Sequence, residues 1–354
     1  MTAMQKLWRL EQYPDDIVSR DHLVFQEEAI PEMQDGDVKI KVVYVSIDPS
    51  NRLWIRPEGS YLPPFPLGVV MPAACIGVVA ESRHPRYEVG QKVQGIWGWQ
   101  EYVVLSGGPE DAQLPMEQGG ILHLPEQPAG TQLLDFFGLF GVHGLTAYFG
   151  MVDVGKAKAG DTVLISAAAG AIGSLTTQIA KNLGCRVIGL AGGSDKCQKV
   201  IDEFGADACI DYKNDDIRER ISELAPDGVD VYFDNVGGHT LNAALECMNT
   251  FGRIIGCGMI SDYNDQDNPT PIFNMWKMVE KELTLKGFLL YTYMDKVPEA
   301  SRQLHEWVRA GDLHILENIT QCLARAGWAY SEMMRGATIG KNLVAMDLEA
   351  GDTP

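Results

Sequence analysis

The 354-residue sequence predicts an α/β protein with a β-rich first domain and a doubly wound parallel sheet in the second. Three observations support this prediction. Short extended runs separated by prolines and glycines fill the first part of the chain, strands and helices alternate from Asp161, and β character returns at Asn342 to Met346. We therefore expect domains at 1–135 and 136–315, with residues 316–354 returning to the first domain.

The β-rich domain is predicted from runs such as Val38–Val45, Ala73–Ala80 and Lys92–Ile96. Each run is short, and prolines and glycines separate it from the next one. The pattern changes near Leu133, where the chain becomes helical in pieces. Short strands with such turns favour a small barrel or sandwich for the first domain.

A strand, a turn, a helix and a second strand open the other domain. The apolar run Val163–Ser166 is typical of a buried strand, Ser174–Leu183 has apolar residues at helical spacing, and Arg186–Leu190 supplies the next strand. This order can hold the pyrophosphate of a dinucleotide at the N-terminus of the helix. The strands Val229–Asp234 and Gly252–Gly256 continue the alternation and predict a doubly wound sheet.

The turn of this unit has small residues at the three positions of a G-x-G-x-x-G motif, namely Ala168, Gly170 and Gly173. Gly170 would let the backbone approach the phosphates, and Gly173 would let the helix pack closely on the strand. The alternative is a glycine-permitted tight turn in an ordinary α/β domain. The surrounding strands and helix favour a nucleotide site.

The end of the second strand indicates which dinucleotide binds. An NAD site usually has an acidic residue there, about 20 residues after the glycines, to hold the ribose 2′-hydroxyl. Here residues 191–194 are Ala-Gly-Gly-Ser, and Lys196 follows. A small uncharged turn with a lysine suits a 2′-phosphate and favours NADP, although Lys196 is equally compatible with a solvated residue in the first turn of a helix.

Composition limits the other classes of function. The net charge is −19, with 45% hydrophobic and 22% charged residues, which is typical of a soluble globular protein and argues against non-specific binding to nucleic acid or anionic membranes. No segment resembles a signal peptide or a membrane span. Seven widely spaced cysteines favour reduced thiols and a cytoplasmic location.

Several short motifs occur in a fixed order along nearly the whole chain. They are Ser46–Pro49, Tyr61–Pro64, Gly144–Tyr148, Asp234–Gly238 and the stretch GMISDYN that ends at Asn264. In this order they resemble the zinc-independent medium-chain dehydrogenase/reductases, in the branch of NADPH-dependent 2-alkenal, prostaglandin and curcumin reductases. The bacterial curcumin reductases are especially similar.

This resemblance implies a GroES-like β-barrel domain and a Rossmann domain, with the cofactor in the cleft between them. It implies that Lys196 and Tyr212 hold the 2′-phosphate of NADP, and that Asn235, Cys257 and Phe288 line the adenosine and nicotinamide. The complete set of expected cofactor-binding residues is Thr146, Ala168, Gly170, Ala171, Ile172, Gly173, Gly192, Lys196, Tyr212, Asn235, Cys257, Ile260, Phe288 and Thr338.

Zinc is an alternative within this superfamily and requires particular ligands. A catalytic site would need a cysteine and a Gly-His-Glu motif in the first domain, and a structural site would need four closely spaced cysteines. Only Cys75 precedes Cys185, and no Gly-His-Glu occurs. The sequence therefore predicts no metal.

Without a metal, conjugate reduction is the simpler chemistry, because it needs a hydride at the β-carbon and a hydrogen-bond donor for the enolate oxygen. In the family, the tyrosine matching Tyr263 lies beside the nicotinamide ribose and the substrate carbonyl. We expect Tyr263 to be the donor. The alternative is a tyrosine of the pocket wall that only positions the substrate.

The chain departs from the family pattern at Ser50, where the branch has a tyrosine that lines the substrate pocket. The expected pocket residues are Ser50, Arg52, Trp54 and Trp97, although a structural salt bridge is an equal alternative for Arg52. Thr338 replaces an asparagine that contacts the cofactor in relatives. The natural substrate therefore cannot be carried over from the family.

Together these observations predict an NADPH-dependent ene-reductase that acts on α,β-unsaturated aldehydes or ketones. The first alternative is a quinone reductase of the same superfamily, and the second is a non-catalytic NADPH-binding protein. Relatives commonly pair through the edge of the Rossmann sheet, so a homodimer through Leu283–Leu290 is expected.

Overall fold

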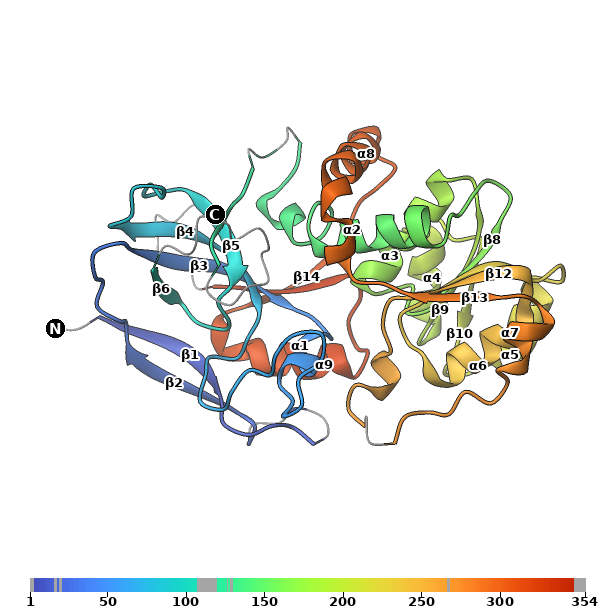
Figure 1. Ribbon diagram of the computed structural model, residues 1–354, viewed down its shortest axis with the longest axis horizontal. Helices are drawn as coiled ribbons and strands as arrows, with labels where there is room; N and C mark the ends of the chain where they lie inside the picture. The colour runs from blue at the N-terminus through green and yellow to red at the C-terminus, as the bar shows by residue number, and fades with distance from the viewer. Residues whose placement is uncertain are drawn as a thin grey trace. The chain divides into compact units, whose positions relative to one another are not determined.

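The computed structural model describes residues 3–15, 18, 21–106, 120–125, 127, 130–265 and 268–346. The chain divides into two compact units (Figure 1). The first unit contains Met1–Leu134, Glu317–Thr338 and Asn342–Pro354, and the second contains Asp135–Leu316 and Ile339–Lys341. No helix within the described ranges is long and apolar enough to cross a membrane.

The first unit is organised around a sheet that has seven strands in the described part of the chain. Its order is β14-β15-β3-β4-β5-β7, and β6 pairs with β3. A separate hairpin, β1 (Met4–Leu10) and β2 (Leu23–Ala29), lies in the same unit. The strands of the larger sheet are β3 (Asp37–Ile47), β4 (Ala74–Ser82), β5 (Lys92–Ile96), β6 (Tyr102–Ser106), β7 (Leu122–His123), β14 (Glu317–Gln321) and β15 (Lys341–Ala345).

Strand β3 forms the centre of this sheet because it pairs antiparallel with β4, β6 and β15. Val38, Ile40 and Val42 alternate along it and are fully buried in the core. Helix α9 (Ala326–Met334) adds Tyr330 to the same core. Gly77 of β4 allows this packing, since a Cβ there would lie 2.5 Å from Cγ2 of Ile40.

The C-terminal part of the chain returns to the first unit, as predicted. Strand β15 pairs antiparallel with β3, with Asn342 opposite Ile47 and Ala345 opposite Tyr44. Leu343 and Val344 are buried there. The second strand of the return, β14, lies beside β15 at the edge of the sheet.

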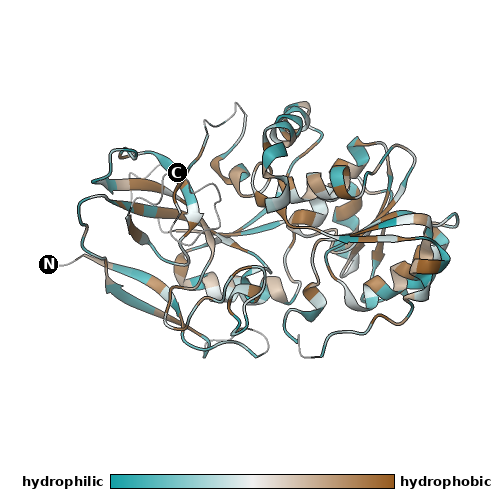
Figure 2. Ribbon diagram, viewed as in Figure 1, coloured by the Kyte–Doolittle hydropathy of each residue, from teal (hydrophilic) through white to brown (hydrophobic). Residues whose placement is uncertain are grey.

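The second unit is organised around a parallel sheet, which has six strands within the described residues. The strand order is β10-β9-β8-β11-β12-β13. The chain adds β9 and β10 on one side of β8 and β11, β12 and β13 on the other, so the order of addition switches between β8 and β11, as in a doubly wound Rossmann sheet. Apolar residues occupy much of these strands (Figure 2). The strands are β8 (Thr162–Ile165), β9 (Arg186–Ala191), β10 (Ala208–Asp211), β11 (Val229–Asp234), β12 (Met248–Gly256) and β13 (Thr284–Gly287).

Helices cover both faces of this sheet, as right-handed crossovers require (Figure 1). On one face, α5 and α6 bury Ile221 and Leu245 in one cluster with Leu164 and Tyr232 of the strands. On α3, apolar residues at helical spacing, including Leu175 and Ile179, are fully buried. The principal helices of the unit are α2 (Val142–Phe149), α3 (Ala171–Asn182), α4 (Ser194–Asp202), α5 (Ile217–Leu224), α6 (Gly238–Cys247), α7 (Trp276–Glu280) and α8 (Val297–Ala310).

The fold class is confirmed, and the observed elements differ from the predicted ones mainly at their ends. Helix α3 begins at Ala171 rather than Ser174, because the turn leads into it directly from Gly170 without a capping side chain. Strand β13 is shorter than the predicted Leu283–Leu290, because a new 3-10 helix begins at Leu290.

Candidate functional site

Four strands of the second unit end at one edge of the parallel sheet. Strand β8 ends at Ile165, β9 at Ala191, β11 at Asp234 and β12 at Gly256. The strand order reverses between β8 and β11, which is the point where open α/β sheets bind ligands outside the carboxyl ends of their strands. The candidate site is therefore built from the segments that follow these four strands, together with Tyr212 after β10 and Phe288 after β13.

The turn after β8 is shaped by its small residues. A Cβ on Gly173 would lie 2.2 Å from the carbonyl oxygen of Ala167, so only glycine permits the observed packing of α3 on the turn. A Cβ on Gly170 would meet only that same oxygen, at 3.2 Å, which leaves the outer side of the turn open. The backbone of the turn can therefore be approached closely from outside, as a pyrophosphate site needs.

Ala168 replaces the first glycine of the motif, and the neighbouring strand accommodates it. The Ala168 N–H donates to the carbonyl of Leu190 at 2.9 Å, and the residue is fully buried. A Cβ on Gly189 of β9 would lie 2.9 Å from the Cβ of Ala168. The missing side chain at Gly189 therefore provides the room for the added methyl group, and the turn is kept.

Helix α3 directs its N-terminus toward this edge. Gly170 is its N-cap residue and makes no side-chain cap, so the N–H groups of the first turn, from Ala171 to Gly173, have no partner within the helix. The segment 339–341 contacts the other side of the turn, where Gly340 N–H donates to the carbonyl of Ala169 at 2.8 Å. Backbone donors and the positive end of the helix dipole suit a phosphate group.

The turn after β9 brings together residues that are distant in sequence. A Cβ on Gly192 would lie 2.7 Å from the Tyr212 hydroxyl and 2.9 Å from Cε of Lys213. Both side chains therefore lie over Gly192. Asp211 fixes this arrangement, because its Oδ1 accepts the N–H groups of Gly193 at 2.7 Å and of Lys213 at 3.1 Å.

Ionisation at this turn reflects burial and neighbouring charges. Burial, and then the positive charge of Lys213, lower the pKa of the half-buried Lys196 below its ordinary value. Burial, and then the charge of Asp211, raise the pKa of Tyr212. The pKa of Asp211 is lowered because its carboxylate accepts hydrogen bonds from the Asn214 side chain and the Gly193 N–H. This carboxylate is therefore ionised and hydrogen-bonded within the protein.

Asp234 organises the turn after β11. One oxygen, Oδ1, accepts hydrogen bonds from the hydroxyl of Tyr232 at 2.7 Å and of Ser166 at 3.2 Å, and from the N–H groups of Val236 and Gly237. Burial raises the pKa of Asp234 above its ordinary value. Asp234 opens the Asp234–Gly238 motif but is not among the predicted site residues. An acidic residue at the end of a strand, directly before a glycine turn, was the available sign.

Ser166 links this network to a predicted cofactor residue, Asn235. The Ser166 hydroxyl accepts the backbone N–H of Asn235 at 2.8 Å, and the Asn235 side-chain amide donates to the Ser166 carbonyl at 2.8 Å. The ends of β8 and β11 are thereby joined. The side chain of Asn235 is held in one orientation at the point where the strand order reverses.

Tyr263 lies beside the segment that follows β12. Its hydroxyl accepts the N–H of Met259 at 3.4 Å, and a Cβ on Gly258 would lie 3.0 Å from that hydroxyl. The segment is anchored because the N–H groups of Cys257 and Gly258 both donate to the carbonyl of Asp234. The 3-10 helix η3 (Ile260–Asp262) then presents Tyr263.

The thiol of Cys257 is poorly suited to act as a nucleophile. Burial, and then the charge of Asp234, raise its pKa to about 12, so it is protonated at neutral pH. Cys257 can therefore line a site at this edge, but it does not bring thiolate chemistry there.

The two other residues predicted in the second unit lie on neighbouring elements. Thr146 is buried on α2, and Phe288 directly follows β13. A Cβ on Gly150, at the end of α2, would lie 2.4 Å from Cε2 of Phe233 and 3.2 Å from Cζ of Phe288. The rings of Phe233 and Phe288 therefore both lie against Gly150 at the end of α2.

The predicted substrate-pocket residues belong to the first unit. Arg52 is 3% exposed and donates from Nη2 to the carbonyl of Pro14 at 2.7 Å. The indole of Trp54 donates to the hydroxyl of Tyr61 at 2.9 Å, and that of Trp97 donates to the carbonyl of Gly120 at 3.0 Å. Ser50 directly precedes the short helix α1 (Asn51–Trp54). Thr338 also belongs to this unit.

Metal-binding side chains are not clustered in the described ranges. Among those residues, no three or more histidine, cysteine, aspartate or glutamate side chains are grouped to hold a metal ion. Cys75, the one cysteine of the sequence before Cys185, is buried and free, and burial raises its pKa to about 12.

Two family models match the chain. Residues 6–112 match the "N-terminal domain of oxidoreductase", and residues 171–308 match "Zinc-binding dehydrogenase". The second match begins at Ala171, directly after the glycine turn, and includes Gly173 and the segment that carries Tyr263. Its description names zinc, but the chain has neither the Gly-His-Glu motif nor the closely spaced cysteines that would bind it.

Curated proteins and solved structures agree with these matches. The chain is 33% identical to the NADPH-dependent curcumin reductase of Escherichia coli (strain K12), over 98% of the chain and 97% of that protein. It is 34% identical to the 2-alkenal reductase (NADP(+)-dependent) of Nicotiana tabacum, over 89% and 88%. The crystal structure of CurA in complex with NADPH from Vibrio vulnificus superposes with a TM-score of 0.88 at 32% identity, covering 97% of this chain and 100% of that one.

These matches extend over nearly the whole chain and over both units. They confirm the resemblance drawn from the ordered motifs. The chain belongs to the zinc-independent medium-chain dehydrogenase/reductases, in the branch of NADPH-dependent 2-alkenal, prostaglandin and curcumin reductases.

Proposed function

We propose that the protein is an NADPH-dependent ene-reductase that reduces the C=C bond of α,β-unsaturated aldehydes or ketones. The observation that carries this proposal is the position of Tyr263, whose hydroxyl lies against Gly258 at the same sheet edge as the glycine turn. A phenol at this edge can serve as a hydrogen-bond donor next to a bound nicotinamide. Relatives named for curcumin and 2-alkenal reduction support the same reaction.

The residues of the second unit fit NADP. The open turn at Gly170 and the N-terminus of α3 suit the pyrophosphate. Lys196 and Tyr212, at the turn around Gly192, suit the 2′-phosphate. The proposed cofactor-binding residues are Thr146, Ala168, Gly170, Ala171, Ile172, Gly173, Gly192, Lys196, Tyr212, Asn235, Cys257, Ile260, Phe288 and Thr338.

When bound, reduced nicotinamide would supply a hydride to the β-carbon of the substrate and become NADP+. Tyr263 would donate a hydrogen bond to the carbonyl oxygen as negative charge develops on it, and a proton from Tyr263 or water would reach the α-carbon to complete the saturated product. Asp234 and Ser166 hold Asn235 and the Cys257–Gly258 backbone in place. Ser50, Arg52, Trp54 and Trp97 remain the proposed substrate-pocket residues.

Replacing Tyr263 by Phe tests the proposed donor. Loss of one donor to a developing oxyanion costs about a hundredfold in kcat, so the Tyr263→Phe variant should lose about that much kcat on an enone, with NADPH affinity unchanged. Tyr102→Phe, on β6 of the first unit, is the matched control and should keep full activity. A Tyr263→Phe variant that changes only KM would show a positioning role. One with unchanged kcat and KM would remove Tyr263 from the reaction.

A homodimer is also part of this proposal. All four residues of β13 are exposed at the edge of the parallel sheet, and large apolar side chains near it are exposed as well. Exposed edge strands readily pair with another chain. A second copy pairing through β13 would double the mass measured by light scattering, whereas a monomer at micromolar concentration would contradict this part of the proposal. The exposed apolar residues are Phe251, Trp276, Val279 and Leu285.

The free thiols support a cytoplasmic location, which is part of this proposal. All seven cysteines of the chain are free, and none forms a disulfide. Unpaired cysteines in this number are typical of proteins kept in a reducing compartment. NADPH-dependent reduction of small carbonyl compounds fits the same compartment.

A further inference from the structure

Lys213 contacts the turn around Gly192 from the side of β10. A Cβ added to Gly192 would lie 2.9 Å from Cε of Lys213 and 2.7 Å from the hydroxyl oxygen of the neighbouring Tyr212. The Lys213 side chain therefore lies against the backbone that separates β9 from α4. Strands β9 and β10 pair in parallel with Asp211 opposite Ala191, which places residues 212–213 beside this turn.

Lys196 reaches the same turn from α4. It lies in the first turn of that helix, two residues after Ser194. It is half-buried, whereas Lys213 is exposed. The positive charge of Lys213 is the second cause, after burial, of the lowered pKa of Lys196, which shows that the two ammonium groups interact.

Two interacting cations are unusual on a chain with a net charge of −19. A phosphate dianion between the two ammonium groups would stabilise both charged forms. Asp211 is held at the base of this turn, where its oxygens accept hydrogen bonds from Gly193 N–H, Lys213 N–H and the Asn214 amide.

The backbone at this turn is also held in a defined shape. Gly193 has a φ of 101°, a conformation that favours glycine, and its N–H is fixed by Asp211. The same carboxylate fixes the N–H of Lys213. Asp211 therefore positions the base of the Lys213 side chain relative to the Gly192–Gly193 turn.

We propose that Lys213 is a second cationic ligand of the cofactor's 2′-phosphate, facing Lys196 across the turn at Gly192, and that it contributes to the preference for NADP over NAD. This inference rests on the proposed NADP site and adds a specificity residue to it. Lys196, Tyr212 and Lys213 then surround the phosphate, while Gly193, where a Cβ would meet no atom within 4 Å, leaves room for the ribose.

The test uses two nucleotides that differ only in this phosphate, titrated calorimetrically into the full-length chain. Adenosine 2′,5′-bisphosphate has the 2′-phosphate, and adenosine 5′-monophosphate lacks it. Loss of one charge-assisted hydrogen bond weakens binding by about tenfold. Lys213→Ala should therefore weaken the bisphosphate by about tenfold and leave the monophosphate unchanged, and Lys213→Arg should retain most of the affinity.

Lys199→Ala is the matched control, because Lys199 is an exposed lysine on the same helix α4 and the substitution removes the same charge. It should leave both affinities unchanged. If Lys213→Ala behaves like Lys199→Ala while Lys196→Ala still weakens the bisphosphate, the Lys213 inference is wrong and the NADP site stands. If the unaltered chain binds both nucleotides equally, the NADP site is wrong as well.

Discussion

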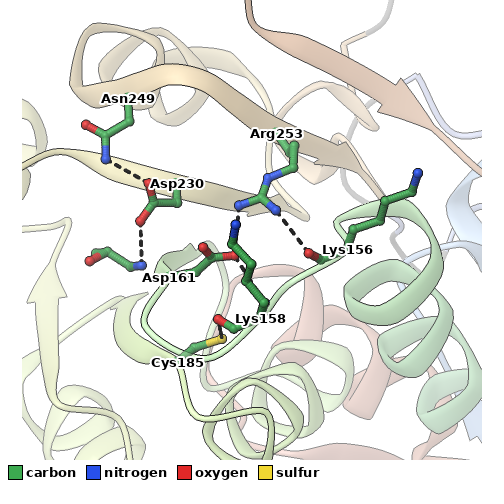
Figure 3. Close-up of polar contacts among 8 residues, drawn as sticks. Lys156, Lys158, Asp161, Cys185, Asp230, Asn249 and Arg253 are labelled. Atoms are coloured by element: carbon green, nitrogen blue, oxygen red, sulfur yellow. Dashed lines mark hydrogen bonds and ion pairs between the residues drawn. The ribbon is translucent and has the colours of Figure 1, made fainter.

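The two edges of the parallel sheet use polar residues in different ways. At the amino edge, shown in Figure 3, Asp161 pairs with Arg253 at 2.8 Å, and Arg253 also donates to the carbonyl of Lys156. Asp230 accepts from the Thr162 N–H and from Asn249, each at 2.8 Å. These contacts join the starts of β8, β11 and β12 to one another.

The carboxyl edge is arranged differently. Gly170 caps α3 without a side chain, and the two lysines near Gly192 interact with each other across the turn. The Asp234 and Asp211 networks there resemble the amino edge, and they support the segments that carry Asn235, Cys257 and the turn at Gly192. We infer that polar groups at the amino edge stabilise the sheet, whereas those at the carboxyl edge are positioned to bind.

Among the variants that distinguish the two edges, Gly173→Val should have the largest effect. Its Cβ would lie 2.2 Å from a backbone oxygen, so α3 would have to move away from the turn. Such overpacking costs about 3 kcal/mol of unfolding free energy, and displacement of the helix N-terminus should weaken NADPH binding by about a hundredfold. Denaturant unfolding and NADPH fluorescence titration measure the two effects. A variant with unchanged NADPH affinity would show that the turn does not hold the pyrophosphate.

Arg253→Ala should affect stability alone. It leaves the Asp161 side chain, which is only 7% exposed, without its ion pair, at a cost of about 2 kcal/mol in unfolding free energy. The affinity for NADPH should not change, because Arg253 lies at the opposite edge. A loss of NADPH affinity in a fully folded Arg253→Ala protein would contradict the separation of roles between the edges.

The architecture could be predicted because its signals are local. The apolar runs and the glycine turn identified β8, α3 and β9, and Asn342–Met346 identified the returning strand. The start of α3 could not be predicted from side chains, since a backbone turn at Gly170 leads into it. The tolerance of Ala168 depends on Gly189 in the next strand, a contact that no local pattern contains.

The candidate site shows the same limit. Lys196 was predicted from the small uncharged turn before it together with the family resemblance. Lys213 approaches the same turn because β10 pairs with β9. No pattern in the sequence around Lys196 or Lys213 indicates that these two strands are neighbours. The role of Asp234 depends partly on the hydroxyl of Ser166, which is 68 residues away in the sequence and meets Asp234 only in the folded sheet.

Deuterium transfer tests the central claim most directly. The protein is incubated with NADPH deuterated at the transferable position of the nicotinamide and with an α,β-unsaturated ketone, and the product is examined by NMR. The account predicts a saturated ketone with deuterium at the β-carbon. An allylic alcohol with deuterium at the former carbonyl carbon would contradict it. So would an enone that stays unchanged while a quinone, supplied in a parallel incubation, is reduced.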